Sequence, residues 1–201
     1  MGFGILFTGW FLLLNVFYSA YTDLLSALIT LAALTRLGRY DRHFRMALVW
    51  AVVFAVYGAA ELALTLVAAL APLSAIGKLL SAGAPLWLTL PRYAILGSMS
   101  VFTLLGVRAI GEEVDAIDVY GRTGYLIPLN AGVFALCALL EIPAVGALFG
   151  GLAAPVFVVA VLAMTAVTAL DLALIYRAYR RICLPGELTE PKRAAGKEEK
   201  R

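Results

Sequence analysis

The sequence predicts an all-α fold, a polytopic transmembrane helical bundle of about six spans with a short charged cytoplasmic tail. Of its 201 residues, 63% are hydrophobic and 14% are charged, whereas a soluble domain is nearer half apolar and about a quarter charged. The mean hydropathy is +0.93. The apolar residues form long runs, and each span needs about 20 residues. This composition excludes an ordinary soluble globule, a disordered chain and a nucleic-acid-binding module.

Three apolar runs occupy the first part of the chain. The first extends over about residues 3–20, and Asp23 is the expected N-cap of the second helix. The second run, residues 24–37, is short for a span, so it either crosses a thinned bilayer or is re-entrant. A polar link over 38–45 leads to the third run, residues 46–70.

The second part of the chain contains three further runs. Residues 71–90 hold Pro, Ser and Gly, which predicts an interfacial connection and then the start of a fourth span that ends near Val107. A charged helix extension or loop comes next, over 108–122. The remaining segments are a fifth run over 125–142, a Gly-rich turn over 146–151 and a sixth run over 153–176.

Charge placement predicts the orientation. All lysines and arginines except Lys78 and Arg92 fall in the link near residues 36–45, in the central link, or from Arg177 onward. With six spans these three segments lie on one side, which the positive-inside rule assigns to the cytoplasm. We therefore expect both termini to be cytoplasmic, in the bacterial cytoplasmic membrane.

Domain organisation is predicted by the same runs. We expect one six-helix transmembrane domain over residues 1–180 and a cytoplasmic tail over 181–201, disordered at its end. The surrounding partner is the lipid bilayer. A membrane-protein partner or a homo-oligomer stays open, and no nucleic-acid partner is expected.

Polar residues inside the apolar runs are the candidate functional groups, because an unpaired charge in the membrane costs at least a few kcal/mol. Glu61 lies roughly 13 Å inside the third run at 1.5 Å per residue. Tyr57 shares its helical face, and Asn15 lies in the same half of the membrane. Arg92 falls near the level of Glu61, so a Glu61–Arg92 ion pair is one interpretation. Asp23 and Glu141 are expected at hydrated outer boundaries.

Asp171 and Asn130 are the inner candidates. They are predicted at a similar depth in the sixth and fifth runs, although Asp171 could instead reach the cytoplasmic interface beside Arg177. Polar residues recur at helical spacing, which predicts polar stripes turned toward the bundle interior. The stripes pair Thr8 with Asn15, Thr65 with Tyr57 and Glu61, Cys137 and Glu141 with Asn130, and Thr168 with Asp171. The predicted lining of a substrate or ion pathway is Asn15, Tyr57, Glu61, Arg92, Asn130 and Asp171.

Three classes of function remain open from the sequence. The leading hypothesis is a small integral membrane protein that binds or passes a small solute through a polar bundle interior. A non-catalytic structural or regulatory subunit is the alternative. A third is a lipid-modifying enzyme, in which Glu112, Asp115 and Asp118 are weak candidates for a metal, together with Glu113. The sequence favours a non-enzymatic role and predicts no catalytic residue and no cofactor. With one histidine and two distant cysteines, it also offers no metal site built on His and Cys ligands.

Overall fold

The structure is a computed structural model that describes residues 2–14, 20–71 and 86–183, and within them every regular element is helical. Expectations for Asn15, for most of 71–90 and for the tail from 184 lie outside these residues. The elements are α1 (Gly2–Leu13), α2 (Ala20–Leu37), α3 (Arg42–Leu70), α5 (Leu86–Glu113), α6 (Ile117–Leu140), α7 (Pro143–Phe149), a 3-10 turn (Gly150–Leu152) and α8 (Ala153–Cys183).

The predicted runs and the observed helices agree in order and differ at their ends. α2 begins at Ala20, so Asp23 lies in its first turn and is not its N-cap. The central link is partly a helix extension, because α5 continues to Glu113. A tight turn comes next, in which Asp115 has a φ of 56°, and α6 then begins at Ile117. The charged residues at the end of α5 can continue this helix because they lie beyond its apolar segment.

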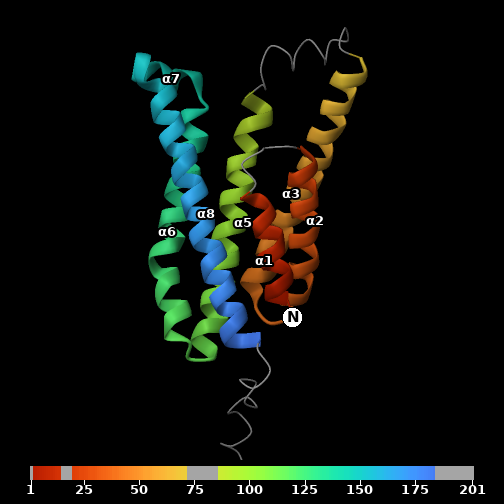
Figure 1. Cartoon of the computed structure of the whole chain (residues 1–201), viewed down its shortest axis with the longest axis vertical. Helices are drawn as coiled ribbons and strands as arrows, with labels where there is room; N and C mark the ends of the chain where they lie inside the picture. Colours follow the sequence, from red (N-terminus) through yellow and green to blue (C-terminus); the bar gives the residue numbers. More distant parts are fainter. Residues whose placement is uncertain (1, 15–19, 72–85, 184–201) are drawn as a thin grey trace, which may run out of the picture.

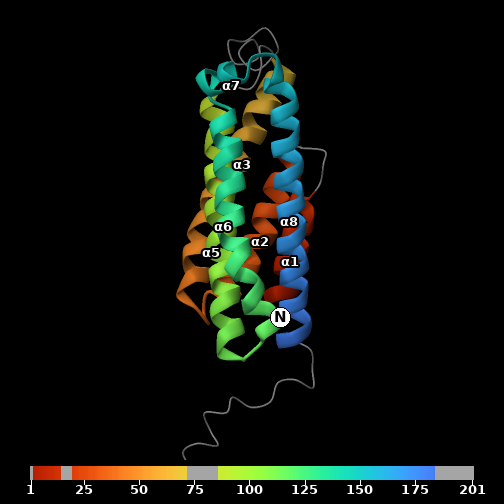
Figure 2. The same cartoon turned by 90° about the vertical axis from the view of Figure 1, so that its left-hand side faces the viewer.

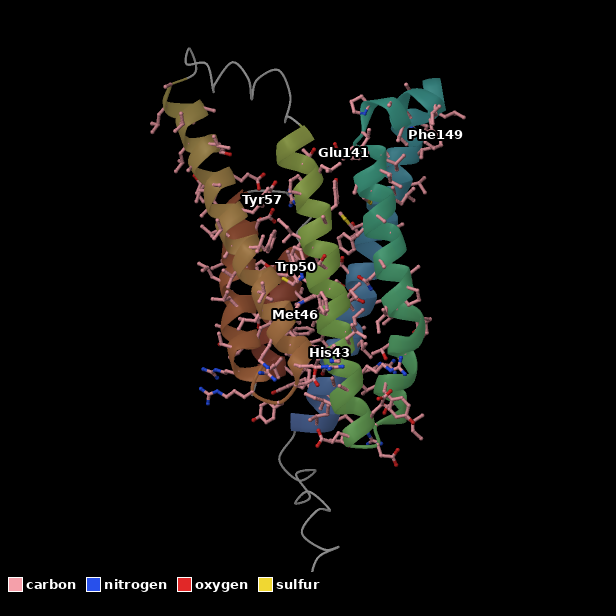
Figure 3. The ribbon with its side chains drawn as sticks, turned by 180° about the vertical axis from the view of Figure 1, so that it is seen from behind. His43, Met46, Trp50, Tyr57, Glu141 and Phe149 are labelled. Carbon is pink, nitrogen blue, oxygen red and sulfur yellow. The ribbon has the colours of Figure 1, made fainter. Side chains whose placement is uncertain are left out.

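The six long helices form a closed ring. Each packs against the next along the chain, in the order α1, α2, α3, α5, α6 and α8, and α8 closes the ring against α1. Neighbouring helices run in opposite directions (Figures 1 and 2), as short connections between packed helices require. The start of α1 and the end of α8 therefore lie at one end of the bundle, here named the terminal end. The opposite end, where α3 ends and where α7 and Glu141 lie (Figures 1 and 3), is named the distal end.

The three basic segments lie together at the terminal end. The α2–α3 turn, the α5–α6 turn and the end of α8 all meet there (Figure 1), and Arg92 is the one basic residue of the described part of the chain far from it. The predicted grouping is thus confirmed as geometry for the described residues, which include Arg177, Arg180 and Arg181 of the third segment. Local interactions close the turns: Asp41 caps α3 by accepting a hydrogen bond from the His43 backbone N–H at 2.7 Å.

Four helical stretches of the described residues are long and apolar enough to cross a membrane by length and composition: α3, α5 from Thr89, α6, and the α7–α8 stretch from Pro143 to Ile182. α1 has 12 residues, about 18 Å at 1.5 Å per residue, and α2 has 18, about 27 Å. Because both are anchored at the terminal end, their other ends lie well below the distal ends of α3 and α5 (Figure 1). This difference in length decides where Asp23 lies.

At Gly9 the backbones of α1 and α2 approach closely. A Cβ on Gly9 would clash with Thr30 Oγ1 and lie 3.0 Å from the Thr30 backbone nitrogen, and Ser26 donates a 2.8 Å hydrogen bond to the Gly9 carbonyl. Small residues allow helix backbones in membranes to approach in this way. The apolar core next to this contact includes Phe3, Leu6 and Trp10 of α1.

Replacing Gly9 by alanine should therefore lower the free energy of unfolding by about 1–3 kcal/mol, the usual cost of overpacking. Gly132 is the matched control, because a Cβ there meets nothing within 4 Å. Gly132→Ala should leave stability unchanged or raise it, since alanine favours helix by about 1 kcal/mol over glycine. Thermal unfolding in detergent measures both variants, and equal effects would contradict the tight α1–α2 contact.

Candidate functional site

A cluster of charged and polar side chains lies where α2, α3 and α5 face one another, above the middle of the bundle. Arg92 of α5 pairs with Asp23 of α2, with 2.5 Å between the guanidinium nitrogen and Asp23 Oδ2. Glu61 and Tyr57 of α3 interact electrostatically with Asp23, and Tyr57 also with Arg92. Figure 3 places Tyr57 in the distal half of α3 and His43 near the terminal end. We name Asp23, Tyr57, Glu61 and Arg92 the distal cluster.

The expected Glu61–Arg92 ion pair is wrong, because Arg92 pairs with Asp23. Asp23 is also not at a hydrated boundary, since only 6% of the residue is exposed. The reason is the shortness of α1 and α2, which places the first turn of α2 inside the bundle and level with Arg92. Glu61 Oε2 is buried and has no hydrogen-bond partner among the described residues.

A second polar group lies deeper, where α5, α6 and α8 meet. Asn130 Nδ2 donates to Asp171 Oδ1 at 2.9 Å and to the Leu126 carbonyl at 2.9 Å. Ser100 Oγ lies 2.6 Å from Asn130 Oδ1 and 3.0 Å from Asp171 Oδ2. Ser100, Asn130 and Asp171 are each fully buried. We name these three side chains the buried ring, because their polar atoms form a closed cycle.

The buried ring confirms that Asn130 and Asp171 lie at one level. It shows the interfacial interpretation of Asp171 to be wrong, because this carboxyl is bonded inside the bundle and has no exposed surface. Asp171 lies six residues before Arg177, and α8 continues as a helix to Cys183. The basic residues at the end of α8 therefore belong to turns nearer the terminal end than the buried ring.

A small cavity lies between the two polar groups. Its volume is about 30 Å³, enough for roughly one water molecule. Its lining includes Asp23 and Arg92 of the distal cluster and Thr168, one helical turn from Asp171, but none of the three residues of the buried ring. The remaining lining is apolar or aromatic: Trp10, Leu13, Leu96, Met99, Phe134 and Met164. On α5 the buried ring and the distal cluster are eight residues apart, about 12 Å, so the cavity occupies the space between them.

The indole nitrogen of Trp10 belongs to this region. It is buried without a hydrogen-bond partner among the described residues, and Trp10 lines the cavity. A buried indole N–H usually has a partner. An unmatched donor in the cavity wall, together with the unmatched Glu61 oxygen, indicates that the interior has hydrogen-bonding capacity beyond what the described residues use.

The predicted inward stripes are correct on some helices and wrong on others. Cys137 and Thr168 are buried on the faces of Asn130 and Asp171. Thr8 and Thr65 are exposed and donate only to carbonyl groups one turn earlier in their own helices. Glu141 is half-buried near the distal end (Figure 3) and accepts hydrogen bonds from side chains of α5, Thr89 and Tyr93, at 3.3 Å each.

The acids of the central link do not converge. Glu112 accepts a 2.7 Å hydrogen bond from Arg108, and Asp118 lies 3.8 Å from Arg181. Asp115 occupies the tight turn between them. Across the described residues, no group of three His, Cys, Asp or Glu side chains could hold a metal ion. The geometry therefore gives no support to an enzyme built on residues 112–118.

Sequence reasoning missed Asp23 and Ser100 as site residues. The signal for Asp23 was present, because Ser26 and Thr30 come three and seven residues later, and all three are buried on one face of α2. Ser100 had a similar signal in Thr103, three residues later and also buried. Each residue also has an ordinary interpretation. Asp23 resembles the start of a helix, and Ser100 resembles a polar contact between helices, so neither stands out as a site residue in the sequence.

Comparisons with known proteins place no family beside this geometry: no protein-family model, no curated protein and no solved structure matches the chain. The function therefore has to be inferred from the distal cluster, the cavity and the buried ring.

Proposed function

We propose that this chain is an integral membrane protein that binds a small cationic solute at the distal cluster and passes it through the polar interior of the bundle. The observation that carries the proposal is the cavity, which is lined by Asp23 and Arg92 and by Thr168, three residues before Asp171. Polar groups inside a membrane bundle generally mark ion and solute pathways. The apolar helices support the assignment to a membrane.

The charge of the distal cluster selects the class of solute. Asp23 and Glu61 supply two carboxylates, and Arg92 supplies one guanidinium. The Asp23–Arg92 pair is internally neutral, so the Glu61 carboxylate is in excess, and its Oε2 atom has no hydrogen-bond partner among the described residues. An unmatched carboxylate oxygen in a partly buried position attracts a cation.

Glu61→Gln is expected to remove this attraction while preserving the shape of the side chain. The matched control is Glu113→Gln, which changes an exposed acid at the terminal end of α5. Each purified full-length protein is reconstituted into vesicles, and uptake is measured for rubidium, for tetramethylammonium and for protons reported by an internal pH dye. We expect uptake of at least one probe by the unchanged protein, roughly a tenfold loss in Glu61→Gln, and no loss in Glu113→Gln.

Two results would contradict the proposal. One is uptake no greater than that of empty vesicles for all three probes. The other is equal uptake by Glu61→Gln and the unchanged protein. Thermal unfolding of each variant before reconstitution separates a lost function from a lost fold.

The proposed topology has six crossings with both termini in the cytoplasm, because the three basic segments gather at the terminal end. Residues 1–180 then form one transmembrane domain, and the remaining residues a cytoplasmic tail. Reporter fusions after Ala20 and after Leu37 should report opposite sides of the membrane. A same-side result would mean that α2 does not cross.

A structural subunit is the second candidate, and the buried ring favours it. A hydrogen-bonded ring on three helices can hold helices together without any solute. The two candidates differ in the Glu61 experiment, because a packing role predicts changed stability and no specific loss of uptake.

A further inference from the structure

The buried ring has three contacts between side chains. When Asp171 is ionised, the side chains supply hydrogens for only two of these contacts. Asn130 has two amide hydrogens, and both are used, one by the Leu126 carbonyl and one by Asp171 Oδ1. This use also fixes the orientation of the amide, because both partners are acceptors. Asn130 Oδ1 must therefore be the atom that faces Ser100.

Ser100 has one hydroxyl hydrogen and two oxygen neighbours. Asn130 Oδ1 lies at 2.6 Å and Asp171 Oδ2 at 3.0 Å, both within hydrogen-bond distance. A carboxylate and an amide oxygen are acceptors only. If Asp171 were ionised, one of these two contacts would bring two oxygens together in a fully buried site with no hydrogen between them.

We propose that Asp171 binds a proton at Oδ2 and that the buried ring is a proton-binding site in the bundle interior. With that proton every contact has one hydrogen: Asp171 donates to Ser100, Ser100 donates to Asn130, and Asn130 donates to Asp171 Oδ1. Binding forms the O–H bond at Oδ2, and release returns the proton to water. The ring must then open, because Ser100 can donate to only one neighbour.

The surroundings of Asp171 contain no cation that would favour the ionised form among the described residues. α1, which packs on α8, has no titratable side chain. On α5 the basic residues are Arg92 and Arg108, each eight residues from Ser100, and Tyr93 lies on the distal side. On α6 the groups above and below Asn130 are Cys137 and Tyr125, with Glu141, Arg122, Tyr120 and Asp118 farther along the helix. On α8 itself the next basic residue is Arg177.

Between the buried ring and the distal cluster lies the cavity described above. Its lining includes Thr168, one turn from Asp171, and Asp23 and Arg92 of the distal cluster. A water molecule fits in the available volume of about 30 Å³. The role of this proton in transport rests on the proposed function, whereas its presence on Asp171 does not.

Infrared spectroscopy of the full-length protein in lipid at neutral pH tests the site. A protonated carboxyl has a carbonyl band separate from those of carboxylates and amides. We expect this band to be lost in Asp171→Asn and kept in the control Asp118→Asn, which changes an exposed acid 3.8 Å from Arg181. Asp171→Asn should keep the unfolding temperature of the unchanged protein, because its amide can donate to Ser100 and accept from Asn130 as the acid does.

Ser100→Ala is the second variant, and it remains informative if Asp171→Asn does not fold. It removes the acceptor of the acid hydrogen, so the band should persist and shift in frequency. Absence of the band from the unchanged protein, or a band indifferent to both variants, would overturn the inference. If the band behaves as expected but the protein takes up no probe, the proton site is supported and only the proposed function is contradicted.

Discussion

Replacing Arg92 by leucine is expected to lower the free energy of unfolding by about 3–5 kcal/mol, the usual cost of leaving one member of a buried ion pair without its partner. Asp23 is 6% exposed and its Oδ2 atom lies 2.5 Å from the guanidinium. Without Arg92, the Asp23 carboxylate would stay buried beside Glu61, a like charge. Thermal or denaturant unfolding of the detergent-solubilised protein measures the loss.

The control is Arg108→Leu. Arg108 and Glu112 form an ion pair at 2.7 Å, but about half of each side chain is exposed. Exposed pairs contribute about 0–1 kcal/mol, so this variant should be nearly neutral. The double change Asp23→Leu with Arg92→Leu should recover most of the stability, because it removes both charges. Equal effects of the two single arginine changes would contradict a buried Asp23–Arg92 pair.

The second large effect is expected at Asn130. Its side chain donates to Asp171 and Leu126 and faces Ser100, all in a fully buried position. Asn130→Leu leaves the Asp171 and Ser100 polar atoms without their partner, and each unmatched buried group costs about 1–3 kcal/mol. We expect a loss of about 2–4 kcal/mol in the free energy of unfolding, measured by the same unfolding assay.

A combined variant tests whether this loss comes from unmatched partners. Changing Asn130 and Asp171 to leucine and Ser100 to alanine removes the whole buried ring and leaves no orphaned polar atom of it. It should be more stable than Asn130→Leu alone. If the combined variant is less stable than the single one, the ring contributes through something other than mutual hydrogen bonding, and the geometry given for it would be contradicted.

These variants also separate packing from transport. A ring that only packs helices can be replaced by apolar residues without loss of uptake. A ring that binds a proton on the pathway cannot, because Asp171 is the group that would carry it. The combined variant, if it folds, should therefore lose uptake in the vesicle assay under the proposed function.

Much of the fold was predictable because hydropathy is a local property. The order of the apolar runs and the grouping of basic segments at one end depend only on the residues of each run. Helix ends were less predictable. Residues 108–113 include the charged Arg108, Glu112 and Glu113 yet continue α5, because a helix can keep its backbone hydrogen bonds beyond its apolar segment.

The sequence predicted a polar site inside the bundle, but it predicted only some of the contacts between the site residues. Asn130 and Asp171 were predicted at one level, and they are hydrogen-bonded at 2.9 Å. A Glu61–Arg92 ion pair was one interpretation of the sequence, but Arg92 pairs with Asp23. Depth estimated along a single helix cannot decide between two acids, because it assumes that every helix reaches the same membrane surface. α1 and α2 are shorter than α3, and that assumption fails for Asp23.

The apolar helical character of the chain, the order of its helices and the few polar residues placed where polarity is costly can all be read from the sequence. Each of these depends on the composition of a single segment. The closing of the six longest described helices into a ring, the binding of Arg92 to Asp23, and the cycle that Ser100 completes with Asn130 and Asp171 appear only in the folded structure. Such contacts depend on the rotation and axial offset of neighbouring helices. Those are set by close approaches such as Gly9 on Thr30, which no single helix contains.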